Sequence, residues 1–152
     1  MLPPEDSTVQ AFLRDSMVVH VATVSPKGRP FVTPLWFVVD DGILYVTTGT
    51  ATRAARHVSA GSPVTLLVTA EHGRHGRHAL RLRGTATIHA GLPSWRILVR
   101  IAAKYYLAPR AMVTELTNIA KWRLRAGYYA QVAGGAGYLR VLPTTADLVV
   151  RP

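Results

Sequence analysis

One segment of this sequence brings together threonine and arginine residues, whose side chains can bind an anionic ligand. Thr47, Thr48 and Thr52 supply hydroxyl groups, and Arg53 and Arg56 supply guanidinium groups three positions apart at the start of an expected short helix. A guanidinium group binds phosphate through two parallel hydrogen bonds, and free backbone amides at a helix start also favour an anion. The pattern predicts a site for a phosphate-bearing ligand. The alternative is a capped helix beside a core aromatic residue, with no ligand.

The strand before this segment offers a surface for a planar ring. Trp36 provides aromatic area, and Pro34 has no backbone N–H to donate to a neighbouring strand. A proline of this kind marks a strand edge or a bulge, where a ligand can approach the backbone. We therefore expect an aromatic ring of the ligand to lie against this strand.

Other kinds of catalytic site find little support in the sequence. The chain has no cysteine, which excludes disulfides, thiolate zinc sites, iron–sulfur clusters and cysteine nucleophiles. Its eight acidic residues lie mostly in turns or near an end, so no paired-carboxylate site is expected. His72, His75 and His78 share one loop, but their spacing matches no zinc motif, and a solvated loop is the expectation. No metal site and no catalytic side chain are predicted.

The elements that must position these residues are mainly strands joined by hairpins. Four helices are expected, over residues 8–15 with Ser7 as the cap, from Thr50 or Thr52 through 58, over 92–106 and over 110–125. About six strands are expected, over 18–24, 29–39, 43–48, 64–69 and 79–89, with a final hairpin of 128–132 and 138–142. Such a set favours a six-stranded antiparallel barrel over a sandwich, because closure removes exposed edges. All 152 residues are expected to form one domain, with an added helix and hairpin at 107–142.

Alternation along the second strand predicts which side chains face the barrel interior. Phe31, Leu35, Phe37 and Val39 share the inner face, which leaves Trp36 outside with Val32, Pro34 and Val38. An outward tryptophan needs cover, which we expect from a second copy of the chain, from a cofactor ring, or from both. Packing by the helix at 92–106 is the alternative. That helix is expected to pack through Trp95, Leu98, Val99 and Ala102, with Arg96, Arg100 and Lys104 on its basic side.

The charge of the chain points to an anionic partner. Lysine and arginine number 18 against 8 acidic residues, a formal net charge of +10. Such a field attracts nucleic acid, anionic lipid or a phosphorylated small molecule. The cations are dispersed and no helix–turn–helix pattern occurs, which argues against nucleic acid. No apolar run has the length of a membrane span and the first residues do not resemble a signal peptide, so a cytoplasmic protein without a membrane partner is expected.

One stretch of the sequence resembles a known family. The run RPFVTPLWFVVDDGILYVTTG (residues 29–49), followed by TRAARHV (residues 52–58), is similar to the pyridoxamine 5′-phosphate oxidase-like split β-barrel flavoproteins. The nearest resemblance is to the actinobacterial flavin/deazaflavin-dependent oxidoreductases. It is clearest over residues 17–70, extends to the AAKYY segment that ends at residue 106, and does not include residues 107–152.

The resemblance implies a homodimer of six-stranded split barrels with two cofactor sites at the interface, and FMN or the deazaflavin F420 as cofactor. The cofactor-facing residues that it implies are Thr33, Pro34, Leu35, Trp36, Val46, Thr47 and Thr48, and the residues near the phosphate are Thr52, Arg53 and Arg56. Many members of the family have a lysine beside the arginine, where this chain has Ala54 and Ala55. A guanidinium group at Arg53 or Arg56 could replace that lysine.

The expected function is therefore an oxidoreductase that uses F420 or FMN to reduce or oxidise a small organic substrate. The many arginines favour F420, whose tail carries a phosphodiester and several carboxylates, and a wider basic groove could form from Arg81 and Arg83 or from the basic side of the 92–106 helix. The alternative is a non-catalytic protein that binds flavin, haem or a tetrapyrrole, with His20 and His57 as the better placed histidines.

Overall fold

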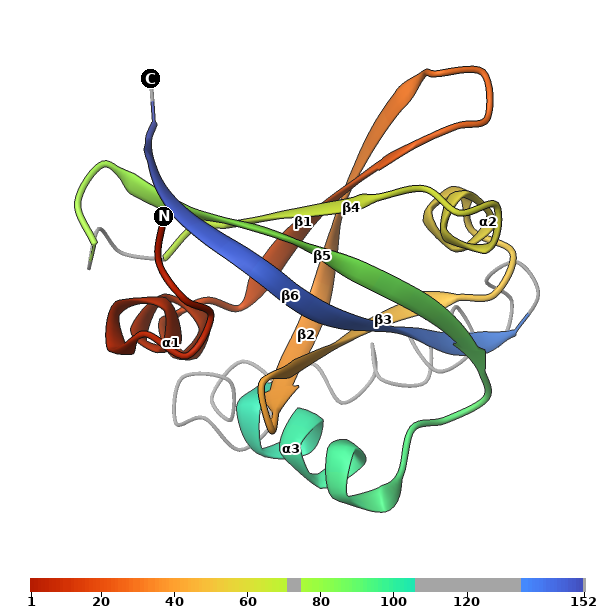
Figure 1. Ribbon diagram of the computed structural model, residues 1–152. Coiled ribbons are helices and arrows are strands. Elements are labelled where there is room, and N and C mark those ends of the chain that lie inside the picture. The colour runs from red at the N-terminus through yellow and green to blue at the C-terminus, as the bar shows by residue number, and fades with distance from the viewer. Residues whose placement is uncertain (71–74, 106–134, 152) are drawn as a thin grey trace, which may run out of the picture.

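Six antiparallel strands close into a barrel in the computed structural model, which describes residues 1–70, 75–105 and 135–151. The strands are β1 (Val18–Val24), β2 (Pro30–Asp40), β3 (Ile43–Gly49), β4 (Val64–Val68), β5 (His78–Ala90) and β6 (Ala136–Val150) (Figure 1). Around the barrel they follow the order β1-β2-β3-β6-β5-β4. This confirms the predicted antiparallel barrel, in which every strand has two neighbours and no edge is left open.

The barrel interior is filled by the inward residues of alternating strands. Val19 and Val21 of β1, Leu44 and Val46 of β3, and Leu66 of β4 have no exposed surface. Along each strand these inward residues alternate with outward ones, as the pleat requires. Burying one such side chain contributes about 1.5–3 kcal/mol. The interior is therefore a packed core, and ligands must bind outside it.

The turns that join β1 to β2 and β2 to β3 form where the sequence predicts them. Asp41 and Gly42 both have positive φ, at 51° and 74°, as a tight two-residue hairpin turn requires. Gly28 has a φ of 76° in the turn between β1 and β2, a conformation that side chains with a Cβ rarely adopt. Both turns hold β2 in register with its neighbours.

In the described part of the chain, three helices pack around the barrel (Figure 1). Helix α1 (Ser7–Asp15) packs Val9, Phe12 and Leu13 into the main core. Its cap is Asp6 rather than the predicted Ser7, since the Asp6 carboxylate accepts a hydrogen bond from the amide of Thr8 at 2.8 Å. No helix in the described part of the chain is long and apolar enough to cross a membrane.

Helix α2 (Arg53–Ser59) is capped by Thr52, one of the two predicted cap residues. Helix α3 (Trp95–Tyr105) begins three residues later than predicted. Its first backbone bond runs from the amide of Leu98 to the carbonyl of Ser94, so Ser94 precedes the first turn. The predicted helix at 110–125 lies outside the described residues.

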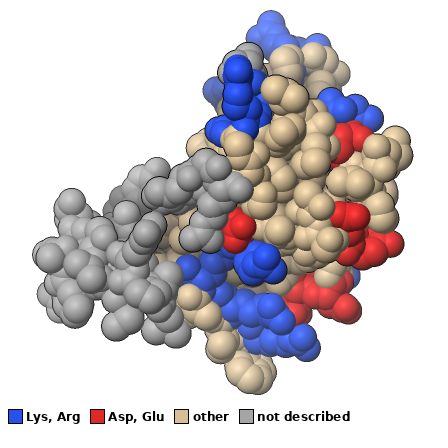
Figure 2. All heavy atoms as spheres, turned by 90° about the vertical axis from the view of Figure 1, so that its left-hand side faces the viewer, with Lys and Arg blue, Asp and Glu red and all other residues tan. Residues whose placement is uncertain are grey.

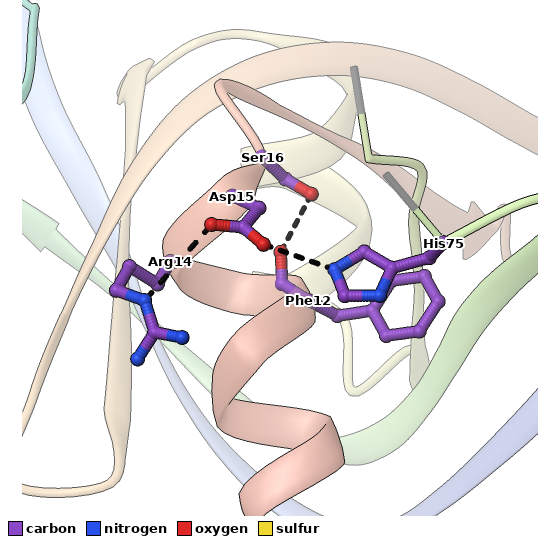
Figure 3. A network of polar contacts seen from close by, with 5 residues as sticks. All are labelled: Phe12, Arg14, Asp15, Ser16 and His75. Carbon is purple, nitrogen blue, oxygen red and sulfur yellow. Dashed lines mark hydrogen bonds and ion pairs between the residues drawn. The ribbon is translucent and has the colours of Figure 1, made fainter. Parts of the chain in front are cut away.

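A small polar network fixes the end of α1 (Figure 3). The His75 ring stacks on Phe12 with 4.0 Å between ring centroids, and its Nε2 lies 3.1 Å from Oδ2 of Asp15. The Ser16 hydroxyl donates to the carbonyl of Phe12 at 2.7 Å. His75 therefore has a packing role. Among the described residues no group of three histidine or acidic side chains could hold a metal ion.

Strand β6 differs from the predicted final hairpin. It runs from Ala136 to Val150 and pairs with both β3 and β5, so residues 143–150, which follow the predicted hairpin, are part of the barrel. The sheet has an irregular register between Arg83 and Gly84, where Pro143 is accommodated. A Cβ at Gly84 would lie 2.2 Å from the carbonyl oxygen of Leu142, which only glycine avoids. The predicted strand at 128–132 and most of the 107–142 extension lie outside the described residues.

Candidate functional site

A cavity of about 550 Å³ lies beside β2, β3 and the start of β6; we call it the threonine pocket. Most of the predicted cofactor-facing residues line it. These are Thr33, Pro34, Leu35, Trp36, Thr47, Thr48 and Thr52. The sequence did not indicate the rest of the lining, which includes Tyr45, Tyr138 and the segment 91–93 before α3. Residues 91–93 and Tyr138 belong to elements far along the chain, so only the closed barrel brings them to this site.

Val46 does not line the threonine pocket, although the resemblance places it there. Its side chain is fully buried in the barrel core. On β3 the inward residues are Leu44 and Val46, and the pleat turns Tyr45 and Thr47 to the outer side. Thr47 and Thr48 both line the pocket because β3 ends at the next residue, Gly49.

Hydroxyl groups order the part of the threonine pocket nearest to α2. The Thr52 hydroxyl donates to the carbonyl of Gly49 at 3.0 Å, accepts from the amide of Ala55 at 3.2 Å, and lies 3.0 Å from the hydroxyl of Thr48. Thr47 donates to the carbonyl of Trp36 at 3.2 Å, which ties β3 to β2. These bonds fix the threonine side chains before any ligand binds, so the wall is preformed.

Trp36 faces outward, as alternation along β2 predicts. Its ring stacks on Tyr105 of α3 with 4.5 Å between centroids and 9° between planes. Phe37 faces the core instead, and Leu35 and Val39 pack against that core. Phe31, the fourth residue of the predicted inner set, is not part of that core and contacts Arg53 and His57 instead.

Helix α3 of the same chain therefore supplies cover for Trp36, the alternative that the sequence left open. Trp36 belongs with Val38, Ile97 and Tyr105 to a second cluster of apolar residues. The side chain is still only half-buried and also lines the threonine pocket. One part of the ring is thus occupied by intrachain packing, and another part faces the cavity.

The basic side of α3, which the sequence suggested as a possible groove for the cofactor, docks the helix to the barrel. Arg96 and Arg100 both reach Oδ1 of Asp40, at 3.1 and 2.9 Å. Lys104 donates to the carbonyl of Phe37 at 3.1 Å. Of the other pair expected to form a basic groove, Arg81 and Arg83, Arg81 is paired with Asp147 at 3.1 Å.

These contacts also rotate α3 away from its predicted packing. Trp95 is 77% exposed and Val99 is 54% exposed, whereas Ile97 and Tyr105 are buried. The helix has apolar residues on nearly every side, so periodicity alone could not choose the packed face. The pairing with Asp40 and the stacking of Tyr105 on Trp36 choose it.

A second cavity of about 610 Å³, the basic pocket, lies between the turn joining β1 to β2 and helix α2. Arg53 and Arg56 line this cavity and not the threonine pocket. Lys27 and Arg29 line it from the turn. These two residues were not predicted from the sequence, although they flank Gly28 in the turn between the first two strands.

Aromatic contacts form the inner side of the basic pocket. The Arg53 guanidinium lies over the ring of Phe31, 5.7 Å from its centroid. His57 meets the same ring edge-on at 6.0 Å, and its Nδ1 lies 2.9 Å from the hydroxyl of the buried Thr23. Thr52 lines the threonine pocket and the next residue, Arg53, lines the basic pocket, so both pockets reach the start of α2.

Comparison with known proteins agrees with this architecture. Several solved structures match the fold at low identity. An F420 reductase is 20% identical with a TM-score of 0.61, and the match covers 91% of this chain and 94% of that chain. A conserved hypothetical protein from Mycobacterium tuberculosis is 16% identical with a TM-score of 0.68, over 96% and 84% of the two chains. The heme storage protein HutZ from Vibrio cholerae is 19% identical with a TM-score of 0.59, over 98% and 95%.

At these identities the likeness to solved structures shows the fold alone. No curated protein matches the chain in sequence. The sequence pattern of the family described as pyridoxamine 5′-phosphate oxidase, however, matches residues 6–130. The matched residues include the β2 and β3 residues that line the threonine pocket. They also include all four cations of the basic pocket. The chain therefore belongs to the pyridoxamine 5′-phosphate oxidase family.

Proposed function

We propose that this protein is an oxidoreductase that holds a flavin-type cofactor, F420 or FMN, in the threonine pocket and acts on a small organic substrate. The observation that carries the proposal is a preformed cavity of about 550 Å³ whose lining residue Thr52 is followed directly by Arg53, one of a cluster of cations. Cavities of roughly 300–1,000 Å³ are typical of sites for small molecules and cofactors. The similarity to an F420 reductase supports the same choice at the level of fold.

The walls of the threonine pocket suit a planar ring with polar edges. Trp36, Tyr45 and Tyr138 supply aromatic surface, and Pro34 leaves its stretch of β2 without one backbone donor. Thr33 adds a hydroxyl group for which no hydrogen-bond partner is seen among the described residues. When bound, a flavin or deazaflavin would supply the hydride transfer, and the protein would supply binding and orientation.

Arg53 and Arg56 are the proposed partners of the cofactor phosphate. Both lie on the basic-pocket side of α2, and Arg53 directly follows Thr52. A lysine in place of Ala54 or Ala55 would not point to this site, because these residues are 1% and 0% exposed and pack α2 on the barrel end. The cations that bind the cofactor phosphate must therefore come from the exposed side of α2 and from neighbouring elements.

The phosphate assignment is tested with the Arg53→Ala/Arg56→Ala double variant. Charge-assisted hydrogen bonds contribute about 1.5–3 kcal/mol each, so we expect the loss of both arginines to lower the affinity for F420 or FMN by at least about a hundredfold. Titration followed by cofactor fluorescence measures this change. Both side chains are exposed, so the melting temperature should stay the same. Unchanged affinity for both cofactors would remove the two arginines from the site.

We also propose that the functional unit is a homodimer. Leu92, Trp95 and Val99 are 71%, 77% and 54% exposed, and Leu92 lines the threonine pocket as well. A second copy that covers these apolar side chains would at the same time close one side of the pocket. Sedimentation should show a dimer at micromolar concentration, and a 16.6 kDa monomer would contradict this proposal.

Haem or tetrapyrrole binding is less well supported by the site. No histidine is among the described residues that line the threonine pocket. His57 lines the basic pocket, but its Nδ1 contacts Thr23. Titration of the purified protein with FMN, F420 and haemin separates the cases. Binding of FMN or F420 with a defined stoichiometry supports the proposal, whereas binding of haemin alone would replace it.

A further inference from the structure

Helix α3 and the segment before it form one side of the threonine pocket. Leu98 and Ile101 line the cavity from the helix, and residues 91–93 line it from the connection to β5. In Figure 1 this connection runs outside the barrel before it reaches α3. The other described lining residues belong to β2, β3, β6 and the segments that flank them. A displacement of α3 would therefore change access to the pocket without disturbing the barrel.

The last turn of α3 is held firmly to the barrel. Tyr105 is buried and stacks on Trp36, and its hydroxyl accepts a hydrogen bond from the amide of Phe37 at 2.8 Å. Lys104 donates to the carbonyl of Phe37 at 3.1 Å, and its Nζ lies 3.6 Å from the centre of the Phe37 ring. Aromatic burial and hydrogen bonds act together here, so this end of the helix should stay in place.

The first half of α3, residues 95–100, has much less apolar contact with the barrel. Ile97 is the one buried side chain in this half, whereas Trp95 and Val99 are 77% and 54% exposed. Ile97 belongs to the small cluster around Val38 and not to the main core. Helices α1 and α2, by contrast, each bury three apolar side chains. An element with few buried apolar contacts opens locally at a lower cost in free energy than the rest of a fold does.

Asp40 supplies the polar hold on this half of α3. Its Oδ1 lies 3.1 Å from Arg96 and 2.9 Å from Arg100, and these arginine side chains are 65% and 48% exposed. Figure 2 shows basic and acidic side chains that adjoin on the surface in this way. Ion pairs within reach of solvent contribute little stability and are screened by salt. The first half of α3 therefore depends on a weak contact that salt can loosen.

The segment before α3 has the properties of a hinge. Gly91 has a φ of 85°, and a Cβ at this position would meet nothing within 4 Å. Residues 90–92 are all exposed, and the amide of Gly91 donates to the carbonyl of Ala136 at 2.9 Å. Hinges are a few residues at the end of an element that absorb changes in φ and ψ without loss of packing. Rotation at Gly91 would break one hydrogen bond and no packed contact.

We propose that the first half of α3 is a gate over the threonine pocket, with its hinge at Gly91 and its latch at Asp40. The gate opens and closes while Tyr105 stays stacked on Trp36, and ligands enter and leave through the open form. The identity of the ligand rests on the function proposed above, but the opening itself does not. A weaker latch speeds entry and release alike, so it changes rates and leaves affinity unchanged.

The test removes the latch and measures the opening by hydrogen exchange of backbone amides. Asp40→Asn removes the charge that Arg96 and Arg100 share. Asp147→Asn is the matched control, because Asp147 pairs with Arg81 at 3.1 Å and not with α3. Exchange is followed at residues 98–101, with residues 19–21 of β1 as the core reference. All proteins are compared at one concentration, so that association is the same, and at low and high salt.

In the unmodified protein we expect residues 98–101 to exchange at least about tenfold faster than residues 19–21, since they open without global unfolding. Asp40→Asn should speed exchange at residues 98–101 by about a further fivefold in low salt, and high salt should remove most of this difference. Arg96→Gln removes one of the two latch partners and should give a smaller increase of about twofold. Asp147→Asn should leave exchange at residues 98–101 unchanged.

Stopped-flow mixing with FMN and with F420 extends the test to the ligand. Asp40→Asn should raise the association and dissociation rate constants by the same factor, and the affinity should stay within about twofold of that of the unmodified protein. Asp147→Asn should leave both rate constants unchanged. Unchanged rate constants in Asp40→Asn, for a cofactor that binds, would overturn the role of the gate in ligand exchange.

Failure of the gate and failure of the proposed function are distinguishable. Exchange at residues 98–101 that is as slow as in β1, or that Asp40→Asn does not change in low salt, would overturn the gate. An equal increase in Asp147→Asn would also overturn it, because the effect would then not come from the latch. If neither FMN nor F420 binds, the proposed function fails, and exchange at residues 98–101 alone decides whether the gate exists.

Discussion

Helices α2 and α3 both present cations, but the two regions use them in opposite ways. On α3 the charges hold the helix to the barrel, through Arg96 and Arg100 on Asp40 and through Lys104 on a backbone carbonyl. On α2 the exposed Arg53 and Arg56 face a cavity together with the turn cations. The two regions present similar numbers of basic residues. The difference between them is the carboxylate of Asp40 at the end of β2, which pairs with the arginines of α3.

This difference shows how a surplus of positive charge is divided between stability and binding. A cation with a carboxylate or carbonyl partner in the same chain has already replaced part of its hydration shell with protein atoms. It therefore gains little further free energy from contact with a ligand. A cation without such a partner keeps its full field. The α3 region should therefore respond to mutation through stability, and the α2 region through affinity.

The largest expected effect on the α3 side is that of Tyr105→Ala. The Tyr105 ring is 5% exposed and stacks on Trp36, and its hydroxyl accepts from the amide of Phe37 at 2.8 Å and lies 2.7 Å from the carbonyl of Met17. Removing a large buried aromatic side chain lowers the free energy of unfolding by about 3–5 kcal/mol. Denaturant unfolding measures this change.

Trp95→Ala serves as the control for Tyr105→Ala, because Trp95 is an aromatic residue of the same helix that is 77% exposed. It should change the free energy of unfolding of one chain by less than about 0.5 kcal/mol. Equal destabilisation by the two substitutions would show that α3 does not pack through the face that contains Tyr105.

A smaller effect is expected from Asp40→Asn. The substitution keeps the shape of the side chain and removes the charge that Arg96 and Arg100 share, and both arginines are about half exposed or more. We expect the free energy of unfolding to fall by about 1 kcal/mol in low salt and by less in high salt. Affinity for the cofactor should be unchanged, since Asp40 lines neither pocket. A gain of more than about threefold in cofactor affinity would mean that the α3 arginines also attract the ligand.

Local patterns in the sequence were sufficient for the first five strands of the barrel, but not for β6. Alternation placed Leu35, Phe37 and Val39 on one side of β2 and Trp36 on the other, because the pleat turns successive side chains to opposite faces. The tight turn at Asp41 and Gly42 followed from residues that accept positive φ. These features depend on neighbours within a few residues, which a single sequence contains.

Both pockets were partly predictable, and of the basic pocket only the α2 side was predicted. Thr33, Pro34, Trp36 and Thr52 were found because they lie in one continuous stretch. Lys27 and Arg29 were missed because their meeting with α2 depends on the closure of the barrel.

The rotation of α3 was mispredicted for a related reason. It depends on Asp40, which is 56 residues away from Arg96 along the chain. The orientation of Val46 was decided by the pleat of β3, but a position carried over from a resemblance did not take that pleat into account.

Trp36 lies between the two regions, and it gives the smallest and most direct test of the comparison. Its ring contacts Tyr105 on the α3 side and lines the threonine pocket. In a Trp95→Phe/Trp122→Phe background Trp36 is the single tryptophan, so its fluorescence reports on this place alone. If the cofactor ring lies against β2, the emission should be quenched as FMN or F420 binds, with the same midpoint as the cofactor signal. Trp36→Phe keeps a stacking partner for Tyr105, so it should change the free energy of unfolding by less than about 1.5 kcal/mol and weaken cofactor affinity by only a few-fold. Quenching that is absent while the cofactor binds would place the ring elsewhere, and Trp36 would then belong wholly to the packing of α3.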